Sequence, residues 1–254
     1  MLGVYLSGTG NTKHCVEKFV SLLDENAEII PLEGAELRDQ IREKRRIVLG
    51  YPTQFSNAPI MVRDFIKNNK YLWVGKEIFV INTMGAFSGD GTGCSARMLK
   101  KYGAMILGGL QIKMPDSVCD SKLLKKSYEQ NRDIIKAADC KIEKWVIQIN
   151  NGIYPQEGLK LIDHAKGLFG QRLWYYRKTA TYSSGIKIND NCIGCGLCVQ
   201  KCPMNNLTLE QNGGKPLQSG KCTMCYSCIS QCPKQAITLL GKNVIEQTRY
   251  EKFL

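Results

Sequence analysis

The chain opens with MLGVYLSGTGNTKHCVEKFVSLLDE, residues 1–25, and this stretch decides the fold of its N-terminal part. The apolar run at 2–6 is typical of a buried strand, and residues 12–25 carry the apolar spacing of an amphipathic helix. Between them lies SGTGNT, Ser7–Thr12, a small loop rich in hydroxyl groups with two glycines. A strand, a glycine-bearing loop and a helix start in this order predict a phosphate-binding site.

The alternation of strand-like and helix-like segments continues to about residue 150. Further strand-like runs lie at 27–32, 46–51, 77–83 and 104–112, and further helical patterns at 35–43, 59–69, 92–102 and 121–149. Several of the strand-like runs are continuously apolar, as expected for strands that are covered on both faces. Five strands, each followed by a helix, predict an α/β domain with a doubly wound parallel sheet.

The composition of the loop discriminates among phosphate ligands. A G-x-G-x-x-G dinucleotide loop would need a third glycine where a lysine stands, and no clean acidic residue follows ~20 positions later. A Walker A motif is absent from the sequence. The hydroxyls of Ser7, Thr9 and Thr12, with the N–H groups of a helix start, suit a terminal phosphate monoester. Gly8 and Gly10 let the backbone approach that phosphate closely.

The loop and the five-strand pattern together resemble the flavodoxins, whose T-x-T-G-x-T loop holds the phosphate of FMN. Ser7 replaces the leading threonine and keeps its hydroxyl. The resemblance implies the strand order 2-1-3-4-5, with the flavin ring held by the loops that follow strands three and four. The phosphate-loop residues are then Ser7, Gly8, Thr9, Gly10, Asn11 and Thr12. The ring-loop residues are Pro52, Thr53, Gln54, Phe55, Ser56, Asn57, Thr83, Met84, Gly85, Ala86, Phe87, Gly89, Asp90 and Gly91.

Phe55 and Phe87 are candidates for stacking on the ring, and each equally suits a core or lid position. In flavodoxins a glycine in the loop after strand three often lets a peptide flip toward the reduced flavin. That loop has no glycine here, so semiquinone stabilisation is not predicted. Asp90 and Tyr51 are candidate acids. The two histidines, His14 and His164, are expected to be ordinary solvent-facing residues.

Eight of the twelve cysteines lie between residues 192 and 232, in two C-x2-C-x2-C-x3-C-P motifs offset by 30 residues. In a two-cluster ferredoxin the first three cysteines of each motif bind one [4Fe–4S] cluster and the fourth binds the other cluster. Cluster one is therefore expected at Cys192, Cys195, Cys198 and Cys232. Cluster two is expected at Cys222, Cys225, Cys228 and Cys202. Structural zinc prefers C-x2-C pairs roughly a dozen residues apart and fits this spacing poorly.

The remaining cysteines, Cys15, Cys94, Cys119 and Cys140, stand singly, mostly within expected helices and strands. We expect them to be small packing residues. Twelve cysteines in a chain that opens without a signal peptide argue for metal or redox chemistry rather than disulfides.

The whole chain resembles the fused flavodoxin–ferredoxin proteins of anaerobes. The expected domains are an FMN-binding domain at 1–150, a partly helical connector at 151–184, and a two-cluster ferredoxin-like α+β domain with a tail at 185–254. The resemblance implies an electron-transfer protein that passes electrons between FMN, two [4Fe–4S] clusters and a redox partner. A flavin-dependent reductase of a small molecule, fed through the clusters, is the alternative, so the sequence leaves open whether the chain is an enzyme.

The formal net charge of +12 falls to about +6 when two clusters and a flavin phosphate are counted. This charge favours an acidic redox protein as partner, with a small-molecule acceptor as the alternative. The basic aromatic stretch RLWYYRK, Arg172–Lys178, would suit a nucleic acid or a membrane surface, but a connector helix is the simpler explanation and no nucleic acid is expected. No apolar run approaches the ~20 residues of a membrane span. A cytoplasmic protein is predicted, and a homodimer is left open.

Overall fold

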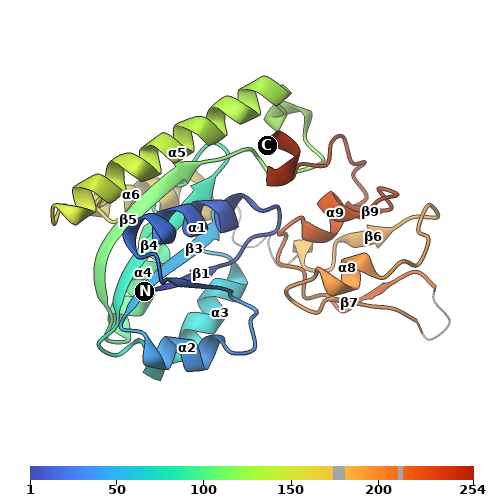
Figure 1. The fold of residues 1–254 in the computed structure, drawn as a ribbon. Helices are drawn as coiled ribbons and strands as arrows, with labels where there is room; N and C mark the ends of the chain where they lie inside the picture. Colours follow the sequence, from blue (N-terminus) through green and yellow to red (C-terminus); the bar gives the residue numbers. More distant parts are fainter. Residues whose placement is uncertain (174–180, 211–213) are drawn as a thin grey trace.

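The computed structural model describes residues 1–173, 181–210 and 214–254. Its N-terminal part is built on one parallel sheet of five strands in the order β2-β1-β3-β4-β5, which confirms the predicted fold class (Figure 1). The strands are β1 (Leu2–Tyr5), β2 (Glu28–Pro31), β3 (Arg46–Pro52), β4 (Glu77–Met84) and β5 (Met105–Lys113).

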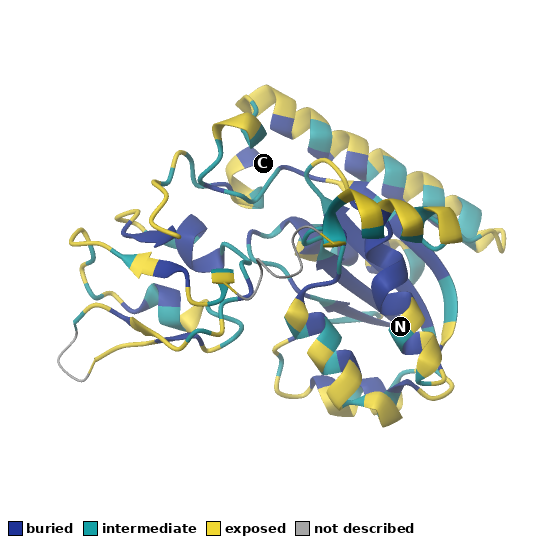
Figure 2. Cartoon of the chain, turned by 180° about the vertical axis from the view of Figure 1, so that it is seen from behind, coloured by how far each residue is buried: buried dark blue, intermediate teal, exposed yellow. Residues whose placement is uncertain are grey.

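Five helices cover the two faces of this sheet: α1 (Asn11–Leu23), α2 (Leu37–Glu43), α3 (Ile60–Asn68), α4 (Gly91–Lys101) and α5 (Tyr128–Asn150). Successive residues of a strand point to opposite faces. In β3, Ile47 and Leu49 therefore pack into the cluster beneath α2, α3 and α4. Val48 packs into the cluster beneath α1 and α5. Figure 2 shows the strands buried between the inner faces of the helices.

The start of α5 differs from the expectation of a helix over 121–149. The helix begins at Tyr128, because Ser127 forms a capping box with Gln130. The Ser127 hydroxyl accepts from the backbone N–H of Gln130, and the Gln130 side chain accepts from the backbone N–H of Ser127. This reciprocal cap satisfies two free donors and sets the helix start. The residues before it form a loop at the carboxyl end of the sheet.

The segment after α5 returns along the outer edge of the sheet. Gly109 of β5 donates to the Pro155 carbonyl (2.8 Å) and accepts from the Glu157 backbone N–H (2.9 Å). The chain then forms helix α6 (Leu161–Gly167) and a π-helical turn (Leu168–Arg172). The stretch 174–180, which includes most of the basic aromatic patch, lies outside the described residues.

The C-terminal module is small and is made of short elements: β6 (Ile186–Ile188), α8 (Leu197–Gln200), β7 (Leu207–Thr208), β8 (Leu217–Gln218), α9 (Ser227–Gln231) and β9 (Ile237–Leu239). β6 pairs with β9 and β7 with β8, both antiparallel. Its core combines apolar residues such as Ile186, Ile229 and Ile237 with Cys198 and Cys228.

The last residues of the chain leave this module and reach the first domain. A short turn of helix at Tyr250–Phe253 lies beside α5 (Figure 1). Phe253 is buried in the apolar cluster beneath α1 and α5.

Within the described residues, no helix is both long enough and apolar enough to span a membrane.

Candidate functional site

The main candidate site is a cavity of about 430 Å³ at the carboxyl ends of the strands, here called the large cavity. It is formed by the loops after β1, β3, β4 and β5, with additional walls from the connector and the C-terminal module. The expected site residues that line it are Ser7, Gly8, Thr9, Asn11, Thr12, Pro52, Thr53, Gln54, Phe55, Thr83, Met84, Gly85, Ala86 and Phe87. Ligands of open α/β sheets bind at this end of the strands.

The loop after β1 presents its polar groups to the large cavity. Gly10 takes the left-handed conformation (φ 88°) that precedes the first residue of α1. The Thr12 hydroxyl lies 2.7 Å from the Thr83 hydroxyl, so the start of α1 and the end of β4 are joined at the cavity wall. Asn11 donates from Nδ2 to the Pro115 carbonyl at 2.7 Å. Its Oδ1 is buried and has no hydrogen-bond partner within the described structure.

The loop after β3 makes a strained turn beside the cavity. Gln54 and Asn57 exchange two backbone hydrogen bonds of 3.0 Å. Between them Phe55 (φ 51°) and Ser56 (φ 55°) both adopt left-handed conformations without glycine. Such conformations are costly for residues with a Cβ and cluster at functional sites. Phe55 lines the cavity, whereas Ser56 is fully buried and is not part of the cavity lining.

Asp90 was expected in a ring loop, but it does not line the cavity. Its carboxylate is fully buried and forms ion pairs with Arg97 and Arg172, and one of its oxygens lies 2.8 Å from His164 Nδ1. Arg172 also donates to the Ser56 carbonyl at 2.5 Å. A buried charge is stable only when it is paired, and this one finds its partners in α4 and in the connector.

Five more of the expected site residues belong to the same loops but do not line the cavity: Gly10, Ser56, Asn57, Gly89 and Gly91.

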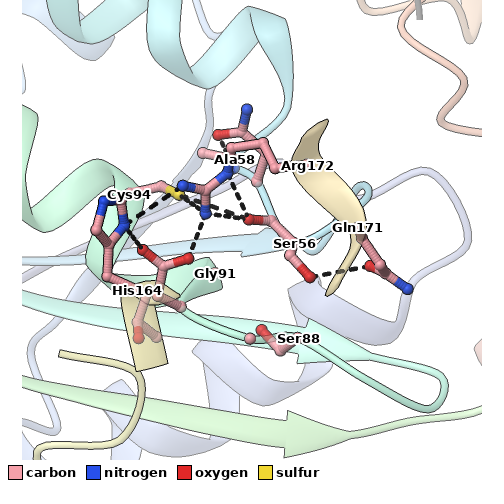
Figure 3. A network of polar contacts seen from close by, with 12 residues as sticks. Ser56, Ala58, Ser88, Gly91, Cys94, His164, Gln171 and Arg172 are labelled. Atoms are coloured by element: carbon pink, nitrogen blue, oxygen red, sulfur yellow. Dashed lines mark hydrogen bonds and ion pairs between the residues drawn. The ribbon is translucent and has the colours of Figure 1, made fainter. Parts of the chain in front are cut away.

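The connector reaches the large cavity through Gln171. Its Oε1 accepts from the Ser56 hydroxyl at 2.9 Å, and the residue lines the large cavity. Arg172 and His164, which contact Ser56 and Asp90, hold the segment that carries Gln171 in place (Figure 3). The His164 side chain is 39% exposed, in line with the expectation of a solvent-facing residue, but its Nδ1 also lies 2.8 Å from an Asp90 oxygen.

His14 is also more constrained than the sequence suggested. Its ring stacks on Tyr250 with centroids 4.3 Å apart, and its Nε2 lies 2.7 Å from Asp139 Oδ1. The other candidate acid, Tyr51, is fully buried and donates to the Gly91 carbonyl. Burial raises the pKa of the Tyr51 hydroxyl.

Sequence reasoning missed two walls of the large cavity. One is the loop after β5, from Met114 to Ser121. Burial raises the pKa of Asp116 in this loop, which lies beside Gly85. The rule that ligands bind beyond the carboxyl ends of the strands could have indicated this loop. The other wall consists of Met224, Cys225 and Tyr226 of the C-terminal module, and no local signal in the sequence predicted it.

The eight motif cysteines line two smaller cavities. The outer cysteine cavity is lined by Cys192, Cys195, Cys198 and Cys232. The inner cysteine cavity is lined by Cys202, Cys222, Cys225 and Cys228. Four cysteines therefore surround each of these cavities. Among the described residues, no three His, Cys, Asp or Glu side chains come together as ligands of a single metal ion.

Backbone donors point at several of these sulfurs. Asn206 donates to Cys202 Sγ at 3.3 Å, and Ala236 donates to Cys232 Sγ at 3.2 Å. Burial raises the pKa of the Cys225 thiol to about 12. A thiolate in this position therefore needs a positive charge beside it, which bound metal supplies.

The single cysteines divide into two groups. Cys15, Cys94 and Cys119 are buried, as expected for packing residues. Cys140 is exposed on α5, so the packing role expected for it is wrong.

Cys225 belongs to the walls of both the large cavity and the inner cysteine cavity. A Cβ added at Gly8 would overlap the Cys225 carbonyl oxygen, so the loop after β1 and the cysteine loop touch there. Gln54 spans the same boundary and donates from Nε2 to the Thr223 carbonyl at 2.5 Å. The two parts of the chain therefore meet where their cavities adjoin.

Comparison with known proteins identifies the C-terminal module. The 4Fe-4S dicluster domain family matches residues 185–233. No curated protein matches the chain.

Similar solved structures include two flavodoxins. The two-electron reduced flavodoxin of Megasphaera elsdenii is 24% identical, covers 49% of this chain and 95% of its own, and has a TM-score of 0.41. Oxidised Flavodoxin 2 from Bacillus cereus is 18% identical, covers 60% and 98%, and has a TM-score of 0.43.

The strand order of the sheet and the family of the C-terminal module together define the class of protein. The chain fuses a flavodoxin-like α/β domain to a 4Fe-4S domain, as the sequence predicted.

Proposed function

We propose that this chain is a flavo-iron–sulfur electron-transfer protein that holds FMN in the large cavity and one [4Fe–4S] cluster in each cysteine cavity. The observation that carries the proposal is the shared wall at Cys225, which borders both the large cavity and the inner cysteine cavity. Met224, Tyr226 and Leu239 also line both cavities, so the two proposed redox sites share a wall of four residues. FMN exchanges one or two electrons and each cluster exchanges one, so adjacent sites let paired and single electrons be converted into each other.

The residues of the first loop fit a flavin phosphate. The loop offers the hydroxyls of Ser7, Thr9 and Thr12 at the start of α1, whose free N–H groups and dipole favour an anion. The backbone approach at Gly8 leaves no room for a side chain. The orphaned Asn11 Oδ1 supplies an acceptor for a ligand hydroxyl, since a buried polar atom of this kind is rarely left unpaired.

The cysteine cavities fit the crossed ligation expected from the motifs. Ligands of a cubane bind different irons, so they stand around the cluster instead of meeting at one point. The inner cysteine cavity combines three cysteines of the second motif with Cys202 of the first. Cys195 of the outer cavity is exposed, so we assign the outer cluster to exchange electrons with the partner.

The net charge favours an acidic redox protein as that partner. A reductase acting on a small molecule is the second candidate. It is favoured by titratable groups in the cavity wall, where Tyr226 donates to Asp120 Oδ1 at 3.3 Å. Turnover of a small acceptor without any protein partner would support the second candidate over the first.

The proposal is tested by reconstituting the full chain without oxygen and measuring iron, flavin and visible absorbance. We expect a flavin band, broad iron–sulfur absorbance and about eight irons per flavin. The Thr9→Val/Thr12→Val double variant should keep its iron and bind FMN at least roughly a hundredfold more weakly, because each hydroxyl bond to a charged group contributes about 1.5–3 kcal/mol. Bound zinc without colour, or unchanged FMN affinity in the double variant, would contradict the assignment.

The crossed ligation is tested by replacing Cys202 with serine. The change should disturb the cluster held by Cys222, Cys225 and Cys228 and leave the other cluster's electron paramagnetic resonance signal intact. Cys140→Ser, an exposed cysteine outside both motifs, is the matched control. Selective loss of the cluster at Cys192, Cys195 and Cys198 would show that each motif binds its own cluster.

A further inference from the structure

The two halves of the cysteine module share one backbone conformation. Residues 30 positions apart take the same left-handed conformation: Gly194 (φ 66°) and Met224 (54°), Gly196 (71°) and Tyr226 (59°), Asn205 (48°) and Gln235 (46°). The backbone N–H bonds to Cys202 and Cys232 are matched in the same way. The main-chain environment of the two cavities is therefore repeated, and differences between the sites arise from side chains.

One such difference lies directly after the first cysteine of each motif. Ile193 is apolar and 60% exposed, whereas its counterpart Thr223 is 3% exposed. Thr223 lines the inner cysteine cavity, and its hydroxyl is buried without a hydrogen-bond partner in the described structure. Its carbonyl is already bonded to Gln54 across the domain boundary. A buried hydroxyl left unpaired is destabilising, so a ligand in the cavity is the natural acceptor.

We propose that the Thr223 hydroxyl donates a hydrogen bond to a sulfur of the inner cluster and raises the reduction potential of that cluster. The inference rests on the proposed function, because it requires a cluster in the inner cavity. Hydrogen bonds to cluster sulfurs stabilise the more negative, reduced state. Ile193 supplies no such donor to the outer cluster.

The Thr223 hydroxyl offsets the unfavourable effect of burial on reduction of the inner cluster. Burial disfavours the extra negative charge of a reduced cluster, and the inner site is the more enclosed of the two because Cys195 opens the outer site to solvent. When one electron passes from the outer to the inner site, the outer cluster is oxidised, the inner cluster is reduced and no atom moves. The Thr223 hydroxyl therefore stabilises the reduced state of the inner cluster, which is the cluster beside the large cavity.

The test is a redox titration of the reconstituted full chain followed by electron paramagnetic resonance. Thr223→Val removes the hydroxyl and keeps the shape, and Thr223→Ser keeps the hydroxyl. We expect the valine variant to lower the reduction potential of the inner cluster by about 59 mV. This shift corresponds to a tenfold change in the equilibrium constant for its one-electron reduction. The outer potential and the FMN affinity should stay unchanged, and the serine variant should resemble the parent. The inner signal is assigned as the one altered in Cys225→Ser.

Ile193→Val, at the counterpart position, is the matched control and should move neither potential. If both clusters assemble and Thr223→Val changes neither potential, or shifts both alike, the inference is wrong while the proposed function stands. If no iron is bound by the parent chain, the proposed function itself fails. Equal shifts in the valine and serine variants would indicate a packing effect and would also overturn the role of the hydroxyl.

Discussion

Gly8 is the residue at which the loop after β1 meets the cysteine module. Any side chain there would overlap the Cys225 carbonyl oxygen, so the contact requires glycine for space, not for an unusual φ. The partner residues Met224 and Tyr226 flank Cys225 in left-handed conformations that glycine adopts in the other half of the module. Both line the large cavity. Backbone strain is thus concentrated where the two proposed redox sites adjoin.

Replacing Gly8 with alanine should push the cysteine loop away from the first domain. Backbone atoms on both sides must move, so we expect weaker FMN binding and slower electron exchange between flavin and clusters, with both clusters still assembled. FMN titration and rapid-mixing absorbance measure these effects. Gly170→Ala is the control, because a Cβ there makes ordinary contact with Phe87. Normal flavin–cluster exchange in Gly8→Ala would mean that this contact does not position the sites.

At the scale of elements, the C-terminal segment from Ile245 to Phe253 connects the two domains a second time. Ile245 donates to the Cys119 carbonyl at 2.8 Å, and Gln247 donates to the Cys232 carbonyl at 2.7 Å. Farther along, the Tyr250 backbone N–H donates to the Thr9 carbonyl at 2.8 Å. The segment therefore links the turn at Cys232 to the loop after β1 without lining the large cavity.

Phe253→Ala should loosen this connection. Removing a buried phenyl ring costs up to about 3–5 kcal/mol, and the backbone bond from Tyr250 to the phosphate loop depends on the segment staying docked. We expect lower stability in urea unfolding and several-fold weaker FMN binding, although Phe253 lies outside the cavity wall.

Leu254→Ala is the matched control, because that side chain is 70% exposed. It should change neither property. A Phe253→Ala variant that loses stability but binds FMN like the parent would show that the segment does not support the phosphate loop.

For the molecule as a whole, the two domains differ in how much regular structure they contain. The first has five paired strands and long helices, whereas the cysteine module has helices of four and five residues and strands of two and three. Its core includes Cys198 and Cys228. We expect a small core of this kind to depend on bound metal, because the free energy of metal binding then contributes to folding.

Chelating the iron under mild denaturation should therefore unfold the module selectively. We expect hydrogen exchange across residues 185–239 to become fast while β1 to β5 stay protected, measured by mass spectrometry on the same sample before and after cluster removal. FMN should remain bound, more weakly because the wall at Met224–Tyr226 is lost. Unchanged protection across 185–239 would show that the module folds without its clusters.

Local patterns in the sequence predicted much of this architecture. Apolar runs such as 46–51 and the helical spacing of 12–25 predicted the strands and helices, and the resemblance based on the SGTGNT loop predicted the confirmed strand order. The loop that carries Ser7 to Thr12 lies at the cavity, as expected for a loop between a strand and a helix. These features follow from neighbouring residues, because side-chain periodicity determines which face of an element is buried.

The tertiary structure alone decided which distant residues meet. Asp90 was expected beside a flavin ring and instead pairs with Arg172, which lies 82 residues away. The C-terminal segment contacts the loop after β1 through Tyr250 and Thr9, and Met224–Tyr226 complete the wall of the large cavity. No local pattern encodes such contacts, because the pairing of a buried charge and the docking of a module depend on what the folded surface offers across the chain.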